Sequence, residues 1–128
     1  MKEVTIIISI LIIVFGSAYL IQSFLNKGTD ELVGELENLK KEIKNQNFQK
    51  KDLELKADKV YENWEDINEK WSTIVLHSEM DLIDTSLIKM KSKIKIGKID
   101  ESMEDIDTSI FLLKHIKEKE KTSLKNIF

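Results

Sequence analysis

The first part of the chain is a long apolar segment, because no charged residue occurs between Val4 and Leu25. As an α-helix, this segment of 22 residues would be about 33 Å long, which is enough to cross the hydrocarbon core of a bilayer with a slight tilt. Its interior polar residues are uncharged, and their hydroxyl groups can donate hydrogen bonds back to the same helix. We therefore expect residues 1–26 to form a transmembrane signal-anchor helix, with the membrane bilayer as one partner of the protein.

A cleaved secretory signal peptide is the alternative to an anchor. Lys2 and the amino terminus form a short basic region, and Gly16-Ser17-Ala18 resembles a cleavage site of small residues. However, the apolar run continues past that point from Tyr19 to Leu25. It is therefore longer than the apolar region of about 7–15 residues that is usual for signal peptides, and the sequence favours an uncleaved anchor.

The charges that flank the apolar segment predict its orientation. The amino terminus and Lys2 precede it, whereas Lys27 is soon followed by acidic residues. Since basic residues favour the cytoplasmic side of a membrane, we expect a single-pass protein of the cell membrane with a cytoplasmic N-terminus. Residues 27–128 would then form an extracytoplasmic helical domain.

The composition of the chain argues against several classes of function. All 20 basic residues are lysines, and the net charge is −3. The chain has no arginine, whose guanidinium binds phosphate or guanine through paired hydrogen bonds, and it has no basic stripe, so we expect no nucleic-acid partner. Cysteine is also absent, which excludes disulfides, thiolate nucleophiles and metal sites with sulfur ligands.

The first half of the domain is predicted to be one long helix over residues 29–72. Gly28-Thr29-Asp30 provides a flexible joint and an N-cap. Apolar residues then recur at alternating steps of four and three, the 3.5-residue period of helices packed as in a coiled coil. A bend or turn near residues 45–51 is the alternative to a continuous helix. The positions that follow this period, which we call the seam, are Leu32, Leu36, Leu39, Ile43, Gln46, Lys50, Leu53, Ala57, Val60, Trp64, Ile67, Trp71 and Ile74.

The second half of the domain is predicted to be an antiparallel hairpin of helices over residues 73–95 and 100–121. The apolar pattern changes phase near residues 72–76, which indicates a kink or junction there. Gly97 is the clearest turn signal, and Asp100 is expected to cap the last helix. The predicted fold class is therefore all-α: one N-terminal transmembrane helix, followed by a helical bundle with long coiled-coil-like helices and a C-terminal antiparallel hairpin.

A cluster of histidines and carboxylates is predicted on this hairpin. If the turn centres near residue 98, then Asp81 faces His115, while His77 lies one helical turn from Asp81 and Glu118 lies one turn from His115. Imidazole and carboxylate groups that converge from facing helices can bind zinc or iron. Simple hydrogen bonds or ion pairs between packed helices are the more ordinary interpretation of the same residues. Nothing in the pattern requires a cofactor.

Trp64 and Trp71 lie seven residues apart on the seam, so they share one face of the predicted helix. Packing in the core is the ordinary role for such a pair. The alternative is an interaction surface for a partner, because the seam is longer than the last helix alone can cover.

Three segments of the chain resemble one known family. They are the stretch around the two tryptophans, residues 77–84 (HSEMDLID), and residues 115–128, which begin HIKEKE and end SLKNIF. Together they are similar to the bacterial family called domain of unknown function 4363, and the similarity covers essentially the whole chain. The resemblance implies a small helical protein with one N-terminal span, and it implies no activity.

These observations favour a membrane-anchored structural or protein-interaction domain. Its partner would be another membrane or envelope protein, or a second copy in a parallel homodimer. A metal- or ligand-binding sensor domain built on His77, Asp81, His115 and Glu118 is the alternative. We expect no enzyme, because the chain has no glycine-rich loop and no nucleophile paired with a base in a turn.

Overall fold

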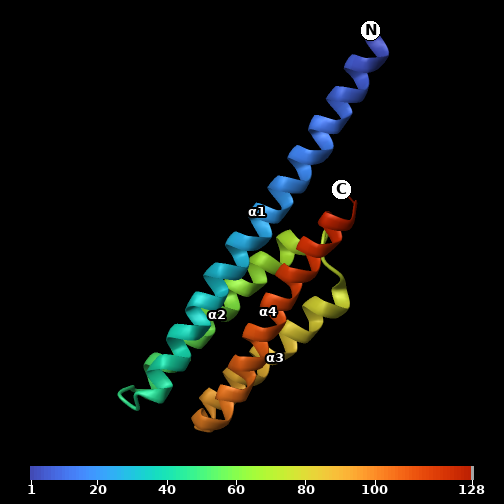
Figure 1. Ribbon diagram of the computed structural model, residues 1–128. Helices are drawn as coiled ribbons and strands as arrows, with labels where there is room; N and C mark the ends of the chain where they lie inside the picture. Colours follow the sequence, from blue (N-terminus) through green and yellow to red (C-terminus); the bar gives the residue numbers. More distant parts are fainter. Residues whose placement is uncertain (128) are drawn as a thin grey trace.

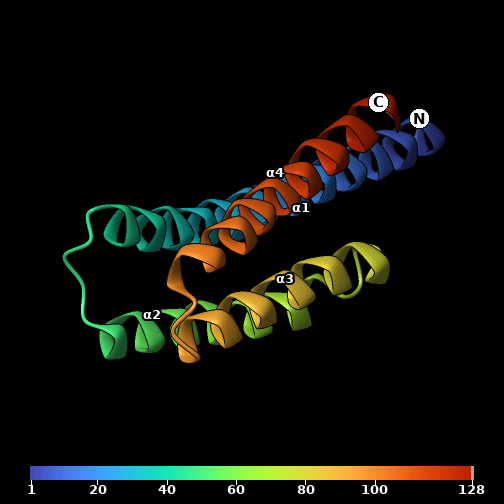
Figure 2. The same ribbon diagram turned by 90° about the horizontal axis from the view of Figure 1, so that it is seen from below.

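The computed structural model describes the backbone of residues 1–127 and the side chains of residues 1–122. The described chain forms four helices, α1 (Lys2–Lys44), α2 (Lys50–Trp71), α3 (His77–Lys95) and α4 (Ile99–Ile127), and it contains no strand. The helices alternate in direction, and α1 and α3 each pack against both α2 and α4 (Figure 1). Figure 2 shows the two resulting layers, with α1 beside α4 in one and α2 beside α3 in the other. The predicted all-α bundle and its C-terminal hairpin are confirmed.

One hydrophobic core fills the space between the four helices. Its residues on α1 and α2 follow the predicted period, since a residue that recurs every 3.5 positions stays on the same side of a helix. The seam is therefore buried within a single chain, where α3 and α4 cover it. The seam positions in the core are Leu32, Leu36, Leu39, Ile43, Leu53, Ala57, Val60, Trp64 and Trp71.

Helix α1 passes without interruption from the apolar segment into the bundle, so the predicted joint and N-cap at residues 28–30 are wrong. The side chain of Thr29 is buried instead of lying at a helix end. A glycine inside a helix costs only about 1 kcal/mol relative to alanine. Burial of a single leucine such as Leu25 or Leu32 contributes more, about 1.5–3 kcal/mol. The division between residues 1–26 and 27–128 thus falls inside one continuous helix.

The chain reverses between Lys44 and Lys50, so the prediction of one helix over residues 29–72 is wrong and its alternative, a turn near 45–51, is observed. Gln46 has a positive φ of 54°, and Asn45 donates its backbone N–H to the carbonyl of Lys41. Gln46 and Lys50 are the two polar positions of the seam, and both are exposed at this turn. The period appears unbroken in sequence because α1 and α2 both present the same pattern to one core.

The two remaining turns lie close to their predicted positions. Residues 72–76 separate α2 from α3, and residues 96–98 separate α3 from α4. Gly97 has a φ of 86°, and the N–H of Lys98 bonds to the carbonyl of Lys93 at 2.8 Å, as in a Schellman motif. Helix α4 begins at Ile99, so Asp100 lies in its first turn and does not cap it.

Candidate functional site

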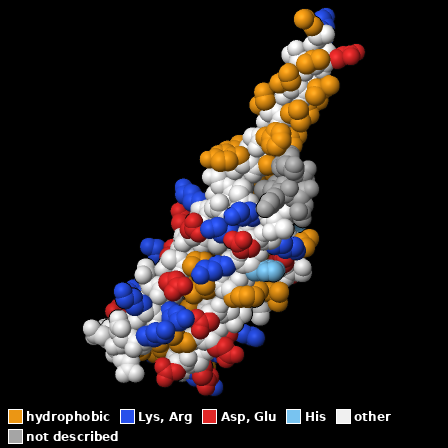
Figure 3. All heavy atoms as spheres, in the orientation of Figure 1, with side chains coloured by type: hydrophobic (Ala, Val, Ile, Leu, Met, Phe, Trp, Pro, Cys, Tyr) orange, Lys and Arg blue, Asp and Glu red, His pale blue; other side chains and the backbone are white. Residues whose placement is uncertain are grey.

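The N-terminal half of α1 stands outside the bundle and exposes its apolar side chains. Ile12, Ile13 and Leu20 are each about two-thirds exposed, and hydrophobic side chains predominate along the projecting segment on the face that Figure 3 shows. Among the described residues, α1 is the one helix long and apolar enough to cross a membrane. Exposed apolar surface of this extent has a favourable environment only in lipid or against another apolar surface.

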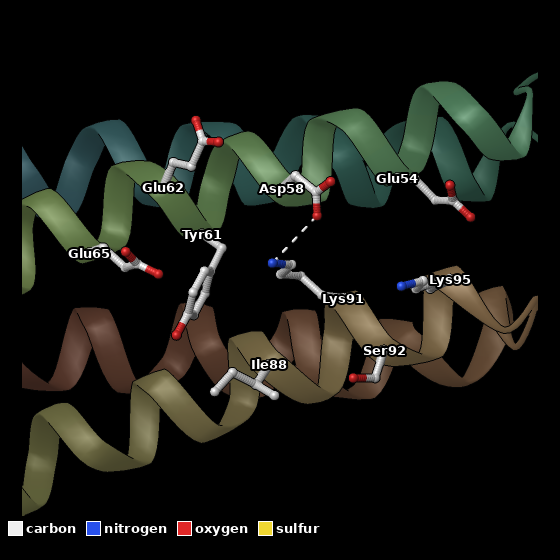
Figure 4. Close-up of a pocket in the computed structure, with 9 residues that line it drawn as sticks. All are labelled: Glu54, Asp58, Tyr61, Glu62, Glu65, Ile88, Lys91, Ser92 and Lys95. Atoms are coloured by element: carbon white, nitrogen blue, oxygen red, sulfur yellow. Dashed lines mark ion pairs between the residues drawn. The ribbon is translucent and has the colours of Figure 1, made fainter.

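A groove of about 750 Å³ lies between α2 and α3 (Figure 4). Four carboxylates from α2 line one wall, and two lysines from α3 line the other. Tyr61 and Ile88 form the apolar part between them, and Ser92 completes the set. The charged residues are Glu54, Asp58, Glu62 and Glu65 on α2, and Lys91 and Lys95 on α3.

Lys91 crosses the groove and connects its two walls. Its Nζ lies 3.5 Å from Oδ1 of Asp58 and 4.5 Å from the centre of the Tyr61 ring, which is a cation–π distance. Four carboxylates against two ammonium groups leave the groove with a negative charge. Chemically, the groove can accept a polar segment that carries positive charge.

A partly buried hydrogen-bond network lies beside the groove, between α2 and α3. The hydroxyl of Tyr61 and Nε1 of Trp64 both donate to Oδ1 of Asp84, at 3.0 and 3.2 Å. Burial, with the hydrogen bond to the Asp84 carboxylate as a second cause, raises the pKa of Tyr61 to about 12. Sequence reasoning missed Asp84, although tryptophans in protein cores commonly donate their indole N–H to an acceptor and Asp84 directly follows a buried residue of α3.

Trp64 and Trp71 pack in the core, which is the ordinary role expected for the pair, and they do not form the alternative, an exposed interaction surface. Both side chains are fully buried, with ring centres 6.1 Å apart in an edge-to-face arrangement. The fold covers them because α2 returns alongside α1 and places both indoles among four helices. Trp71 also lies against Gly28, where an added Cβ would be 3.0 Å from its Cζ2.

The structure does not bring the predicted metal ligands together. His77, Asp81, His115 and Glu118 are all exposed, and no hydrogen bond or ion pair joins any two of them. Among the described side chains, no group of three histidine or acidic residues is arranged to hold a metal ion. Instead, the ring of His115 stacks on Phe111 at a centroid distance of 6.1 Å.

The register of the hairpin explains this difference. Glu79 pairs with Lys119 at 2.6 Å, and Lys93 pairs with Asp105 at 2.8 Å. In that register Asp81 is level with residue 117 and not with His115. On the first turns of α3, the side chain that reaches across to α4 is that of Glu79, and not that of His77 or Asp81.

The comparison with known families extends over most of the chain. The family model described as Domain of unknown function (DUF4363) matches residues 19–127. That range covers the whole bundle and begins within the apolar segment of α1. No significant match is found among curated proteins or among solved structures.

Proposed function

Since the chain belongs to the family described as Domain of unknown function (DUF4363), a description without an activity, we propose that it is a single-pass membrane protein whose bundle acts by contacting other proteins. The observation that supports this proposal most is the continuity of α1. Its first half exposes apolar side chains. Its second half buries one face, from Leu25 at one end to Ile43 at the other, in the core of the bundle. The helix therefore anchors the bundle directly, with no separate linker.

The proposed orientation places the N-terminus in the cytoplasm and the bundle on the extracytoplasmic side. Support comes from Lys2 and the terminal amine, which precede the apolar segment and would be retained on the cytoplasmic side. Insertion is tested by alkaline extraction of membranes, which should leave the full chain in the membrane pellet. Leu11→Asp should release it, since an acidic residue in mid-membrane costs about 2.5–3.5 kcal/mol. Recovery of the unchanged chain in the supernatant would contradict the anchor.

A partner other than a second copy is the better proposal for the bundle. The seam that suggested a parallel coiled-coil dimer is buried within one chain, so it is not free to pair with another. The groove between α2 and α3 is instead open, and its acidic wall favours a protein segment that carries lysine or arginine side chains. Binding there would exchange the contact of Lys91 with Asp58 for contacts with the partner.

Site-specific photo-crosslinking in native membranes tests this contact. A photoreactive residue at Glu62, in the groove, should form a defined adduct with a second protein. The matched control is Glu104, an exposed acidic position on α4. Glu65→Lys should weaken the Glu62 adduct, because it removes negative charge from the groove wall. Equal adducts from both positions, or adducts only between copies of this chain, would contradict the proposal.

A further inference from the structure

The end of the bundle nearest the apolar half of α1 consists of the 72–76 turn and the last turns of α4, and we call it the proximal end. Trp71, at the end of α2, lies against Gly28 of α1. Because α1 and α2 run in opposite directions, the 72–76 turn that follows Trp71 is level with the residues just before Gly28. The turn therefore sits beside the C-terminal limit of the apolar segment.

Helix α4 reaches the same level from the other side of the bundle. Lys40 pairs with Asp107 at 2.6 Å and Lys117 pairs with Asp30 at 3.0 Å, which fixes an antiparallel register between α1 and α4. The helix continues from Lys117 to Ile127, about 15 Å farther toward the N-terminal half of α1. Figures 1 and 2 both show the C-terminal end of α4 alongside α1.

The turn at the proximal end exposes an apolar side chain that the bundle does not use. Leu76 is 59 % exposed, and Ser72 and Thr73 beside it are small and polar. On α1, the exposed aromatic side chains of Tyr19 and Phe24 lie near the same level. Tyrosine, with its amphipathic ring, is typical of the boundary between lipid and water.

From this arrangement we propose that the 72–76 turn rests in the headgroup layer of the bilayer that α1 crosses, with Leu76 in contact with lipid. The inference rests on the proposed membrane anchor. A hydrocarbon core of about 30 Å takes about 20 residues of helix, so a span that begins at Val4 ends near Ser23. Helix α1 is unbroken between Ser23 and Gly28, and the 72–76 turn packs beside this part of the helix. The turn is therefore only a few residues of helix away from the edge of the hydrocarbon core, and it cannot move away from the membrane independently of α1. The bundle then contacts the membrane through the 72–76 turn and the last turns of α4 as well as through α1, and it has a fixed orientation on the membrane.

The absence of cysteine from the chain allows a direct test with single labels. The full chain carrying Leu76→Cys is labelled with an environment-sensitive fluorophore and placed in phospholipid nanodiscs that contain headgroup spin-labelled lipid. Leu55→Cys, on α2, is the matched control because Leu55 is also 59 % exposed. Ile96→Cys is a second control, in the turn at the opposite end of the bundle and 65 % exposed. All three sites are exposed, so substitution leaves the core intact, and tryptophan fluorescence verifies the fold.

We expect several-fold stronger quenching of the label at position 76 than of the labels at 55 and 96. A label at Ile10→Cys, tested with acyl-chain spin-labelled lipid, reports on the anchor itself. Quenching at position 10 with equal, weak quenching at 76, 55 and 96 would overturn the inference and leave the proposed function standing. Absence of quenching at position 10 would overturn the proposed membrane anchor and the inference together.

Discussion

The two halves of α1 belong to one helix but satisfy opposite requirements. In the N-terminal half the apolar side chains point outward in all directions, and hydroxyl groups bond within the helix, as Ser9 does to the carbonyl of Thr5 at 2.8 Å. In the C-terminal half a single stripe of leucines is buried, and polar groups reach other helices, as Glu35 does in accepting a bond from Asn63. A helix in lipid must pair its polar groups locally, whereas a helix in a bundle can pair them across the interface.

The largest difference between the halves should appear when a leucine is shortened. Leu36→Ala removes a fully buried side chain and should lower the free energy of unfolding of the bundle by about 2–5 kcal/mol. Leu11→Ala, on the half-exposed side chain of the apolar segment, should change it by less than about 0.5 kcal/mol. Denaturant unfolding of the full chain in micelles measures both, because Trp64 and Trp71 report on the bundle alone. Equal losses for the two variants would contradict separate environments for the two halves.

Hydrogen bonds give the next contrast. Asp84→Ala removes the acceptor of the fully buried Trp64 Nε1 and should destabilise the bundle by about 1–3 kcal/mol. Ser9→Ala removes a bond within its own helix and should leave the same unfolding curve unchanged. A similar effect of both substitutions would show that the span and the bundle unfold as one unit.

The Asp84 network also predicts a pH dependence for the bundle. In a Tyr19→Phe variant, Tyr61 is the one tyrosine left, and its ultraviolet titration should show a midpoint at about 12 in the folded chain. The unfolded chain should titrate near the ordinary value of about 10. Because the folded state raises this pKa, the stabilisation is complete below about pH 10 and is lost as the pH rises through about 12. Tyr61→Phe should lack this component, and a folded midpoint near 10 would contradict the partly buried hydrogen bond from Tyr61 to Asp84.

Glycine substitutions should give the smallest contrast. Gly34→Ala meets no atom within 4 Å of its new Cβ and should stabilise the bundle by up to about 1 kcal/mol through helix propensity. Gly28→Ala has the same propensity gain but places its Cβ 3.0 Å from Trp71 Cζ2, so it should gain less or lose stability. Thermal unfolding followed by circular dichroism compares them. Equal stabilisation by both would show that Trp71 does not pack closely on α1.

The elements that the sequence predicted well carry local signals. The apolar segment is defined by its length and lack of charge, and Gly97 marks a turn by its backbone freedom alone. The core positions of α1 and α2 followed from their period, since burial repeats with the turn of the helix. The seam thus predicted which residues of α1 and α2 lie in the core, although it did not show that residues 29–72 form two helices.

The elements that were missed depend on contacts between distant parts of the chain. The turn at Gln46 lies on the seam, and the same period on both sides of it hides the reversal. The predicted cluster of His77 with His115 failed because a hairpin's register is set by packing and ion pairs such as Glu79 with Lys119, which the turn alone does not determine.

The continuity of α1 is the feature on which the anchor, the proposed interaction role and the proximal membrane contact all depend. Spin labels at Ser17→Cys and Glu37→Cys, both exposed positions on either side of Gly28, test it by pulsed electron paramagnetic resonance in nanodiscs. An unbroken helix predicts a narrow distribution of distances centred near 30 Å, since 20 residues rise about 1.5 Å each. A broad distribution, or a clearly shorter mean, would show a joint at Gly28 and contradict a bundle held rigidly at the membrane.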